Sequence, residues 1–184
     1  MRTRLVLLLA ALLVAAGCSG GDDPDPDDVA FVQGMVPHHE QAVEMAAMVD
    51  DHADVSPELA DLADRIEAAQ QPEIDRMEGW LDDWDVDDHG SMDHGDMEGM
   101  DHGGMDHGGM DGMMSADQMS ELASLDGAAF EQRWLEMMIE HHRGAVRSAE
   151  SVITDGTDPD VRDLARDVVR TQTAEITEME GLLR

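Results

Sequence analysis

Apolar and polar positions follow a helical period over two long stretches of the chain. In the first stretch the recurring buried-type positions are Phe31, Met35, His38, Ala42, Met45 and Val49. In the second stretch they are Trp134, Met138, His141, Ala145, Ser148 and Val152. Spacings of three and four residues place these side chains on one face of an α-helix. Both stretches therefore predict an amphipathic helix.

A second stripe follows each of these helices. Its members are Leu59, Ala63, Ile66, Gln70, Glu73, Met77 and Trp80 in the first case, and Val161, Ala165, Val168, Gln172, Glu175, Met179 and Leu182 in the second. Ser56-Pro57 and Asp158-Pro159 are typical helix starts, with an N-cap residue followed by proline in the first turn. Each pair of stripes predicts a helical hairpin.

The two hairpins are copies of one unit. Adding 103 to the numbers of Met35, His38, His39, Ala42 and Val43 gives identical residues in the second unit, and adding 102 does the same for eleven positions between Pro57 and Leu81. One hairpin cannot bury its stripe alone, so we expect an all-α four-helix bundle of two repeated hairpins, residues 29–84 and 116–184. Pro37 and Pro72 predict kinks or local breaks, and a short helix is expected near 117–125.

The N-terminal residues have the features of an export leader. Arg2 and Arg4 precede an apolar run that is short for a membrane span, and residues 1–17 are interpreted as a signal peptide. Ala15-Ala16-Gly17-Cys18 resembles the lipobox of a bacterial lipoprotein, which implies acylation of Cys18. Residues 18–28 then form a lipidated tether, and the protein lies on the extracytoplasmic face of the cell membrane. The alternative is an ordinary secreted protein with an incidental cysteine.

Composition excludes several partners. The chain of 184 residues has 43 acidic residues, 11 arginines and no lysine, for a formal net charge of −32. Such a charge repels nucleic acid, and three tryptophans with two phenylalanines offer few surfaces for base stacking. The acidity fits either attraction of cations or adaptation to high salt. The chain is also rich in potential metal ligands, with 16 methionines and 9 histidines.

Polar side chains interrupt the apolar stripes at matching heights. His38 and Gln70 lie on the stripes of the first hairpin, and His141 and Gln172 on those of the second. One helical turn before the two histidines stand Met35 and Met138. Glu73 and Glu175 approach from the facing helices, and His39 and His142 point aside, toward a neighbouring helix or the solvent boundary. Burying these groups is costly unless they bind one another or an ion. We interpret them as a metal site; the alternative is a hydrogen-bonded layer that fixes helix register.

Ligand type indicates which ion. Di-iron bundles use Glu-x-x-His, whereas this chain has Met35-x-x-His38 and Met138-x-x-His141. Thioether in place of carboxylate favours Cu(I), and Ag(I) by the same softness. Met77 and Met179 are interpreted as core filling. Zinc-protease, phosphate-loop and nucleophile motifs are absent from the sequence, so we expect a binding protein and no enzyme.

Residues 85–115 form a low-complexity linker between the hairpins. A Met-Asp-His-Gly repeat supplies the ligand pairs Met92 and His94, Met100 and His102, and Met105 and His107. Glycine and aspartate at this density cannot build a core, so we expect disorder without a ligand. Thioether and imidazole in an oxidising compartment suit Cu(I) storage. The alternative is an acidic spacer produced by repeat expansion.

The doubled motif also carries a family resemblance. Met35-Val36-Pro37-His38-His39-Glu40-Gln41-Ala42, its partner Met138-Ile139-Glu140-His141-His142-Arg143-Gly144-Ala145 and the two Glu-Ile-x-x-Met-Glu-Gly endings resemble the domain of unknown function family 305. This resemblance implies an exported, ferritin-like helical bundle, and some members are associated with copper or silver. Gly34, Pro37 and Ser148 make the two halves chemically unequal.

The leading hypothesis is a membrane-tethered lipoprotein that binds Cu(I) for sequestration, resistance or delivery. Metal ions are the expected ligands, and any delivery partner is unknown. Two alternatives remain open at this point: a ferritin-like, metal-dependent oxidoreductase that binds iron, and an envelope scaffold that binds no metal.

Overall fold

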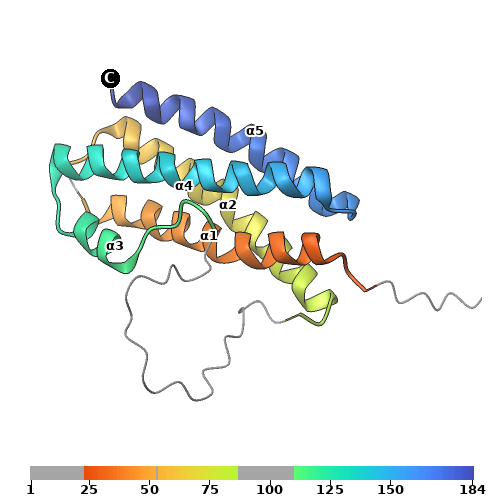
Figure 1. The fold of residues 1–184 in the computed structure, drawn as a ribbon. Coiled ribbons are helices and arrows are strands. Elements are labelled where there is room, and N and C mark those ends of the chain that lie inside the picture. The colour runs from red at the N-terminus through yellow and green to blue at the C-terminus, as the bar shows by residue number, and fades with distance from the viewer. Residues whose placement is uncertain (1–22, 53, 87–109) are drawn as a thin grey trace, which may run out of the picture.

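The computed structural model describes residues 23–52, 54–86 and 110–184, which form five α-helices and no strand. The long helices are α1 (Pro26–Asp50), α2 (Pro57–Asp83), α4 (Gly127–Asp155) and α5 (Pro159–Leu182), and α3 (Ala116–Ala123) is short. α1 packs against α2, α4 packs against α5, and the two hairpins meet through α1 and α4 (Figure 1). The predicted all-α fold is confirmed, and α3 corresponds to the short helix expected near 117–125.

The predicted caps explain where α2 and α5 begin. The Ser56 hydroxyl accepts a hydrogen bond from the backbone N–H of Leu59 at 3.2 Å. The Asp158 carboxylate accepts from the N–H groups of Asp160 and Val161, at 2.7 and 3.2 Å. Both helices have proline in the first turn. Local sequence therefore sets both starts, as capping side chains satisfy the free N–H groups there.

α1 begins earlier than the sequence pattern predicted. Residues 18–28 were expected to form a tether, but the helix starts at Pro26 with Asp25 as its N-cap. The Asp25 carboxylate accepts from the Asp27 N–H at 2.9 Å. Aspartate and proline at this point thus start a helix, in the same way as Asp158-Pro159, although their composition alone is typical of a linker.

Two prolines lie inside helices that remain continuous. α1 runs through Pro37 and α2 runs through Pro72, so the predicted local breaks are wrong. Each proline removes one helical hydrogen bond, at a cost of about 3 kcal/mol. Buried neighbours such as Val36 and Ile74 anchor the helix beside each proline, and this packing offsets the cost.

The antiparallel α1–α4 pair is fixed near both of its ends. At one end the Asp28 carboxylate of α1, which is fully buried, accepts from the backbone N–H groups of Thr157 and Asp158 at 2.9 and 2.7 Å. At the other end the indole N–H of Trp134 donates to the carbonyl of Met45 at 2.7 Å. These contacts fix the register of the two helices, and hence which side chains meet in the middle.

The hydrophobic core has two separate parts. One cluster contains Met45, Ile66, Trp134 and Met138, and the other contains Phe31, Met35, Ile74 and Val168. Along α1 and along α4 the boundary between the clusters falls at the paired histidines. The core is therefore divided by a polar layer at mid-height.

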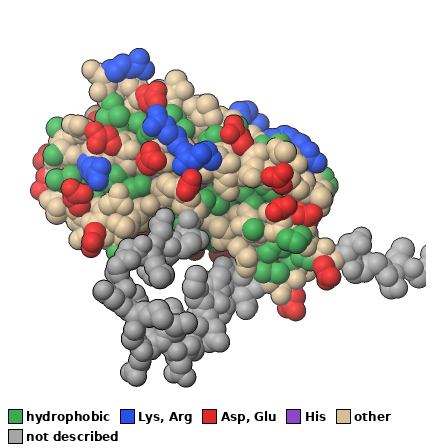
Figure 2. Space-filling view, viewed as in Figure 1, with side chains coloured by type: hydrophobic (Ala, Val, Ile, Leu, Met, Phe, Trp, Pro, Cys, Tyr) green, Lys and Arg blue, Asp and Glu red, His purple; other side chains and the backbone are tan. Residues whose placement is uncertain are grey.

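The surface is acidic and the described helices are not membrane spans. In the view of Figure 2, Asp and Glu side chains are spread over the face, with arginines between them. Within the described ranges, none of the helices combines the length and the apolar character needed to cross a bilayer.

We expect the Asp28→Ala variant to be destabilised by about 2–3 kcal/mol, since hydrogen bonds to a charged group at a buried site are lost. Asp27→Ala is the matched control, because that side chain is exposed on the same turn. Urea unfolding followed by circular dichroism measures both changes. Equal stability of the two variants would show that the Asp28 contacts do not hold the hairpins together.

Candidate metal centre

Four histidines from two helices meet at the polar layer. His38 and His39 lie in the middle of α1, His141 and His142 in the middle of α4, and all four side chains are fully buried. The imidazole centroids of His38 and His141 are 3.7 Å apart. We call these four residues, with the buried Gln70 and Gln172, the histidine layer. The sequence prediction of a buried polar layer is met here, with the two halves in direct contact.

The carboxylates bind the outer histidines. Nε2 of His39 lies 2.8 Å from a Glu73 carboxylate oxygen, and Nε2 of His142 lies 2.8 Å from Glu175. The sequence placed His39 and His142 toward a neighbouring helix or the solvent boundary; they face α2 and α5 and are shielded from solvent. With the Nε2 proton donated to a carboxylate, Nδ1 of each ring has its lone pair free, as in carboxylate–histidine–metal arrangements.

Most polar atoms of the layer have no hydrogen-bond partner. Both ring nitrogens of His38 and of His141, and Nδ1 of His39 and of His142, are buried and unpaired. Both amide atoms of Gln70 and the amide oxygen of Gln172 are unpaired as well. A buried polar group left unpaired costs about 1–3 kcal/mol. The protein's own side chains therefore leave most of the polar atoms of this layer uncompensated.

Burial keeps the central imidazoles neutral. Desolvation, with smaller contributions from the neighbouring histidines, lowers the pKa of His38 from 6.5 to about 3. The same causes lower the pKa of His141 well below 6.5. Burial also lowers the pKa of His142, and Glu175 opposes that shift. Near neutral pH these nitrogens carry lone pairs that can bind a cation.

Two thioethers flank the central pair. Met35 and Met138 are fully buried and precede His38 and His141 by three residues. Side chains at this spacing are neighbours on a helix surface. Met77 and Met179 are fully buried members of the two apolar clusters, as expected of core filling.

The arrangement suits a soft ion better than a hard one. Across the described ranges, no three His, Cys, Asp or Glu side chains gather as metal ligands do. Glu73 and Glu175 each pair with a histidine, an arrangement that orients the imidazole rings. Imidazole pairs with thioethers are ligands that Cu(I) or Ag(I) accepts.

One part of the site corrects the sequence prediction. Residues 110–114, which we call the strap, belong to the linker expected to be disordered, but they cross the bundle between α1 and α4 before α3 begins (Figure 1). Gln41 of α1 holds the strap: its amide donates to the Met114 carbonyl at 2.9 Å and accepts from the Met114 N–H at 2.6 Å. No periodicity signals such a contact. The only sequence signal is that Gln41 and Gly144, equivalent in the repeat, differ.

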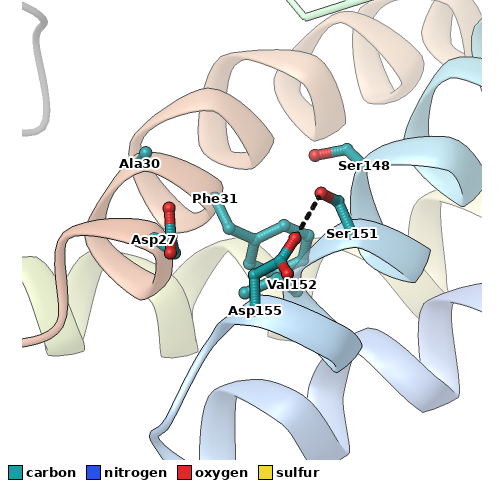
Figure 3. Close-up of a pocket in the computed structure, with 7 residues that line it drawn as sticks. All are labelled: Asp27, Ala30, Phe31, Ser148, Ser151, Val152 and Asp155. Atoms are coloured by element: carbon teal, nitrogen blue, oxygen red, sulfur yellow. Dashed lines mark hydrogen bonds between the residues drawn. The ribbon is translucent and has the colours of Figure 1, made fainter.

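A surface hollow lies away from the layer. It measures about 200 Å³ and lies between the start of α1 and the end of α4 (Figure 3). Phe31, Ser148 and Asp155 help to line it, and Ser151 donates to Asp155 at 3.2 Å. Phe31 and Ser148 are each seven residues from a central histidine, or about 10 Å along the helix. The hollow is therefore not an opening to the layer.

Several predicted ligands fall outside the described residues. They are the linker residues Met92, His94, Met100, His102, Met105 and His107. The proposed lipidation site Cys18 also falls outside them.

Comparisons with known proteins identify the family and the fold. The sequence model of the domain of unknown function DUF305 matches residues 28–183. A DUF305 protein of Streptomyces coelicolor that is presumed to be secreted is 34% identical, with a TM-score of 0.72 over 85% of this chain and 91% of that one. A DUF305 fragment from Deinococcus radiodurans is 32% identical, with a TM-score of 0.72 over 87% and 97%.

A third relative is a copper protein. CopM in its Cu(II)-bound form is 32% identical, with a TM-score of 0.66 over 85% of this chain and 95% of that one. CopM has also been solved with Cu(I) and with Ag bound. Among curated proteins, none matches the chain.

The lowered pKa values predict acid destabilisation of the metal-free protein. His38 binds a proton in the unfolded chain below pH 6.5 but in the folded chain only near pH 3. Its contribution to stability is thus complete above pH 6.5 and is lost as pH falls toward 3, at up to about 1.4 kcal/mol per pH unit. We expect His38→Leu to show a shallower fall between pH 6.5 and 4 in urea unfolding.

The comparison with wild type is essential here, because protonation of the many surface carboxylates also changes stability. That contribution is common to both proteins and cancels in the difference. Parallel curves for wild type and His38→Leu would contradict the buried neutral state of this imidazole.

Proposed function

Since the chain belongs to the DUF305 family, we propose that it is an exported lipoprotein that binds Cu(I) for sequestration, resistance or delivery in the cell envelope. Ag(I) is expected to occupy the same site. The observation that carries the proposal is the histidine layer, in which the neutral imidazoles of His38 and His141 are buried with both ring nitrogens unpaired and with Met35 and Met138 one helical turn away. A soft cation would satisfy these groups without the desolvation cost of a hard ion. The copper- and silver-bound forms of CopM support the assignment.

Each residue of the site has a distinct role in this proposal. His38 and His141 are the central ligands, because they carry unpaired nitrogens on adjacent rings. Met35 and Met138 add thioether sulfur from the same helices. His39 and His142 are further ligands through Nδ1, and their carboxylate partners Glu73 and Glu175 orient the rings. The carboxylates are thus positioning residues.

The linker and the surface extend this function. The linker pairs Met92 and His94, Met100 and His102, and Met105 and His107 provide additional sites of lower specificity. Asp and Glu side chains over the surface raise the local concentration of cations before specific binding (Figure 2). The bundle is then a selective site and the linker a store for several ions.

We expect the bundle and the linker to contribute separately to Cu(I) binding. Four forms of the mature protein test this: wild type, a deletion of residues 87–109, a variant with His38, His39, His141 and His142 changed to alanine, and both changes together. The deletion should lower the number of bound ions but keep the tightest one. The histidine variant should lose the tightest ion, and the combined form should bind none. Competition with a chromogenic Cu(I) chelator measures both quantities.

Thermal unfolding provides the control for folding. An ion that binds only the folded protein raises the melting temperature by mass action. Cu(I) should therefore stabilise wild type and the linker deletion but not the histidine variant, whose helix content is checked by circular dichroism. Equal Cu(I) uptake by wild type and the combined form would refute the proposed function.

Lipidation is tested at Cys18. In a bacterial host that processes lipoproteins, the wild-type protein should appear in the membrane fraction with the mass of an acylated N-terminal cysteine. Cys18→Ser should move the protein to the soluble fraction of the cell envelope or to the medium, because without the acyl chain the protein has no comparable membrane anchor. An unmodified wild-type N-terminus would instead indicate an ordinary secreted protein.

A further inference from the structure

The strap lies directly on the helix that carries His141. A Cβ atom added to Gly144 of α4 would collide with the carbonyl oxygen of Asp111. Gly112 has a φ of 94°, a left-handed conformation suited to glycine, and its own added Cβ would lie 2.7 Å from the Glu140 carbonyl. Backbone therefore packs on backbone at this crossing, one turn of helix from His141.

The strap also reaches the helix that carries His38. The terminal methyl carbon of Met110 lies 3.0 Å from the position of an added Cβ on Gly34. Gly34 precedes His38 by four residues, so the two share one face of α1. Met110 packs against the apolar cluster that contains Met35, whereas Met114 belongs to the cluster on the other side of the layer. The strap thus passes over the histidine layer itself.

The internal repeat shows which side chain of the second hairpin corresponds to this contact. Adding 103 to Gly34 gives Met137, a buried methionine one turn before His141. The second half therefore has a helix methionine where the first half has a glycine. Met110 places a thioether side chain from the strap over that glycine. The strap fills on α1 the place that Met137 fills on α4.

We propose that Met110 is a thioether ligand of the ion bound between His38 and His141. The inference rests on the proposed function, since it names a further ligand of the same site. Gln41 and the glycine crossing at Gly144 hold the strap so that this side chain faces α1. Thioether ligands select Cu(I) and Ag(I) over harder ions, so Met110 adds to selectivity as well as to affinity.

The position of Asp111 agrees with this assignment. Its carbonyl group occupies the space beside Gly144 of α4, while the side chain of the preceding residue, Met110, lies beside Gly34 of α1. The strap therefore contacts both helices that carry the central histidines. Farther along the groove between α1 and α4, where Ala30 and Ser148 help to line it, the groove is hollow (Figure 3). Among the described residues, the strap covers the groove near the histidines.

The test is a titration of the mature full-length protein with Ag(I) up to one equivalent. Methionines carry ¹³C-labelled methyl groups, and the Met110 signal is assigned by its loss in Met110→Leu. We expect this signal to shift together with those of Met35 and Met138. Met110→Leu should weaken Ag(I) binding about tenfold, whereas Met113→Leu, the matched control in the strap, should bind as wild type does.

Gly144→Ala provides an independent variant. Alanine favours the helix but displaces the strap, so Ag(I) affinity should fall as in Met110→Leu while helix content is kept. If His38→Leu weakens Ag(I) binding but Met110→Leu does not, the inference about Met110 is wrong and the proposed function stands. If neither substitution changes the affinity, the bundle site itself is refuted.

Discussion

The fold must keep a layer of polar side chains buried inside an apolar core. Imidazole and amide groups that have left water must be compensated, and in this bundle their protein partners are few. The free energy that offsets this burial comes from the surrounding structure. Its sources are the two apolar clusters on either side of the layer, the capped helix starts, and the contacts near both ends of the α1–α4 pair. The bundle therefore stores a free energy that a suitable ligand can recover.

Much of this arrangement could be predicted from the sequence because it is periodic or local. The stripes fixed four helices, the repeat fixed their pairing, and Ser56 and Asp158 fixed two helix starts. The repeat makes His38 and His141 equivalent, and a twofold axis places equivalent positions at equal distances from it; the coordinates show that these two rings meet.

What could not be predicted is neither periodic nor local. The hydrogen bonds of Gln41 join residues 73 positions apart, and the Met110 contact depends on a missing side chain at Gly34. The local breaks predicted at Pro37 and Pro72 were wrong for another reason. Helix propensity gives the cost of a proline inside a helix, but not the tertiary packing that offsets this cost. The carboxylates were placed near the layer, yet only coordinates show that each one binds the outer histidine of its pair.

The near-twofold relation between the hairpins also concerns ancestry. A single hairpin pairing with its own copy would form an isologous dimer, in which one histidine meets the same histidine of the other subunit on the axis. Once two such copies are joined in one chain, their sequences no longer have to be identical. Each half can then diverge without changing the other. Gly34 opposite Met137 is a divergence of this kind, and it could arise only after the duplication.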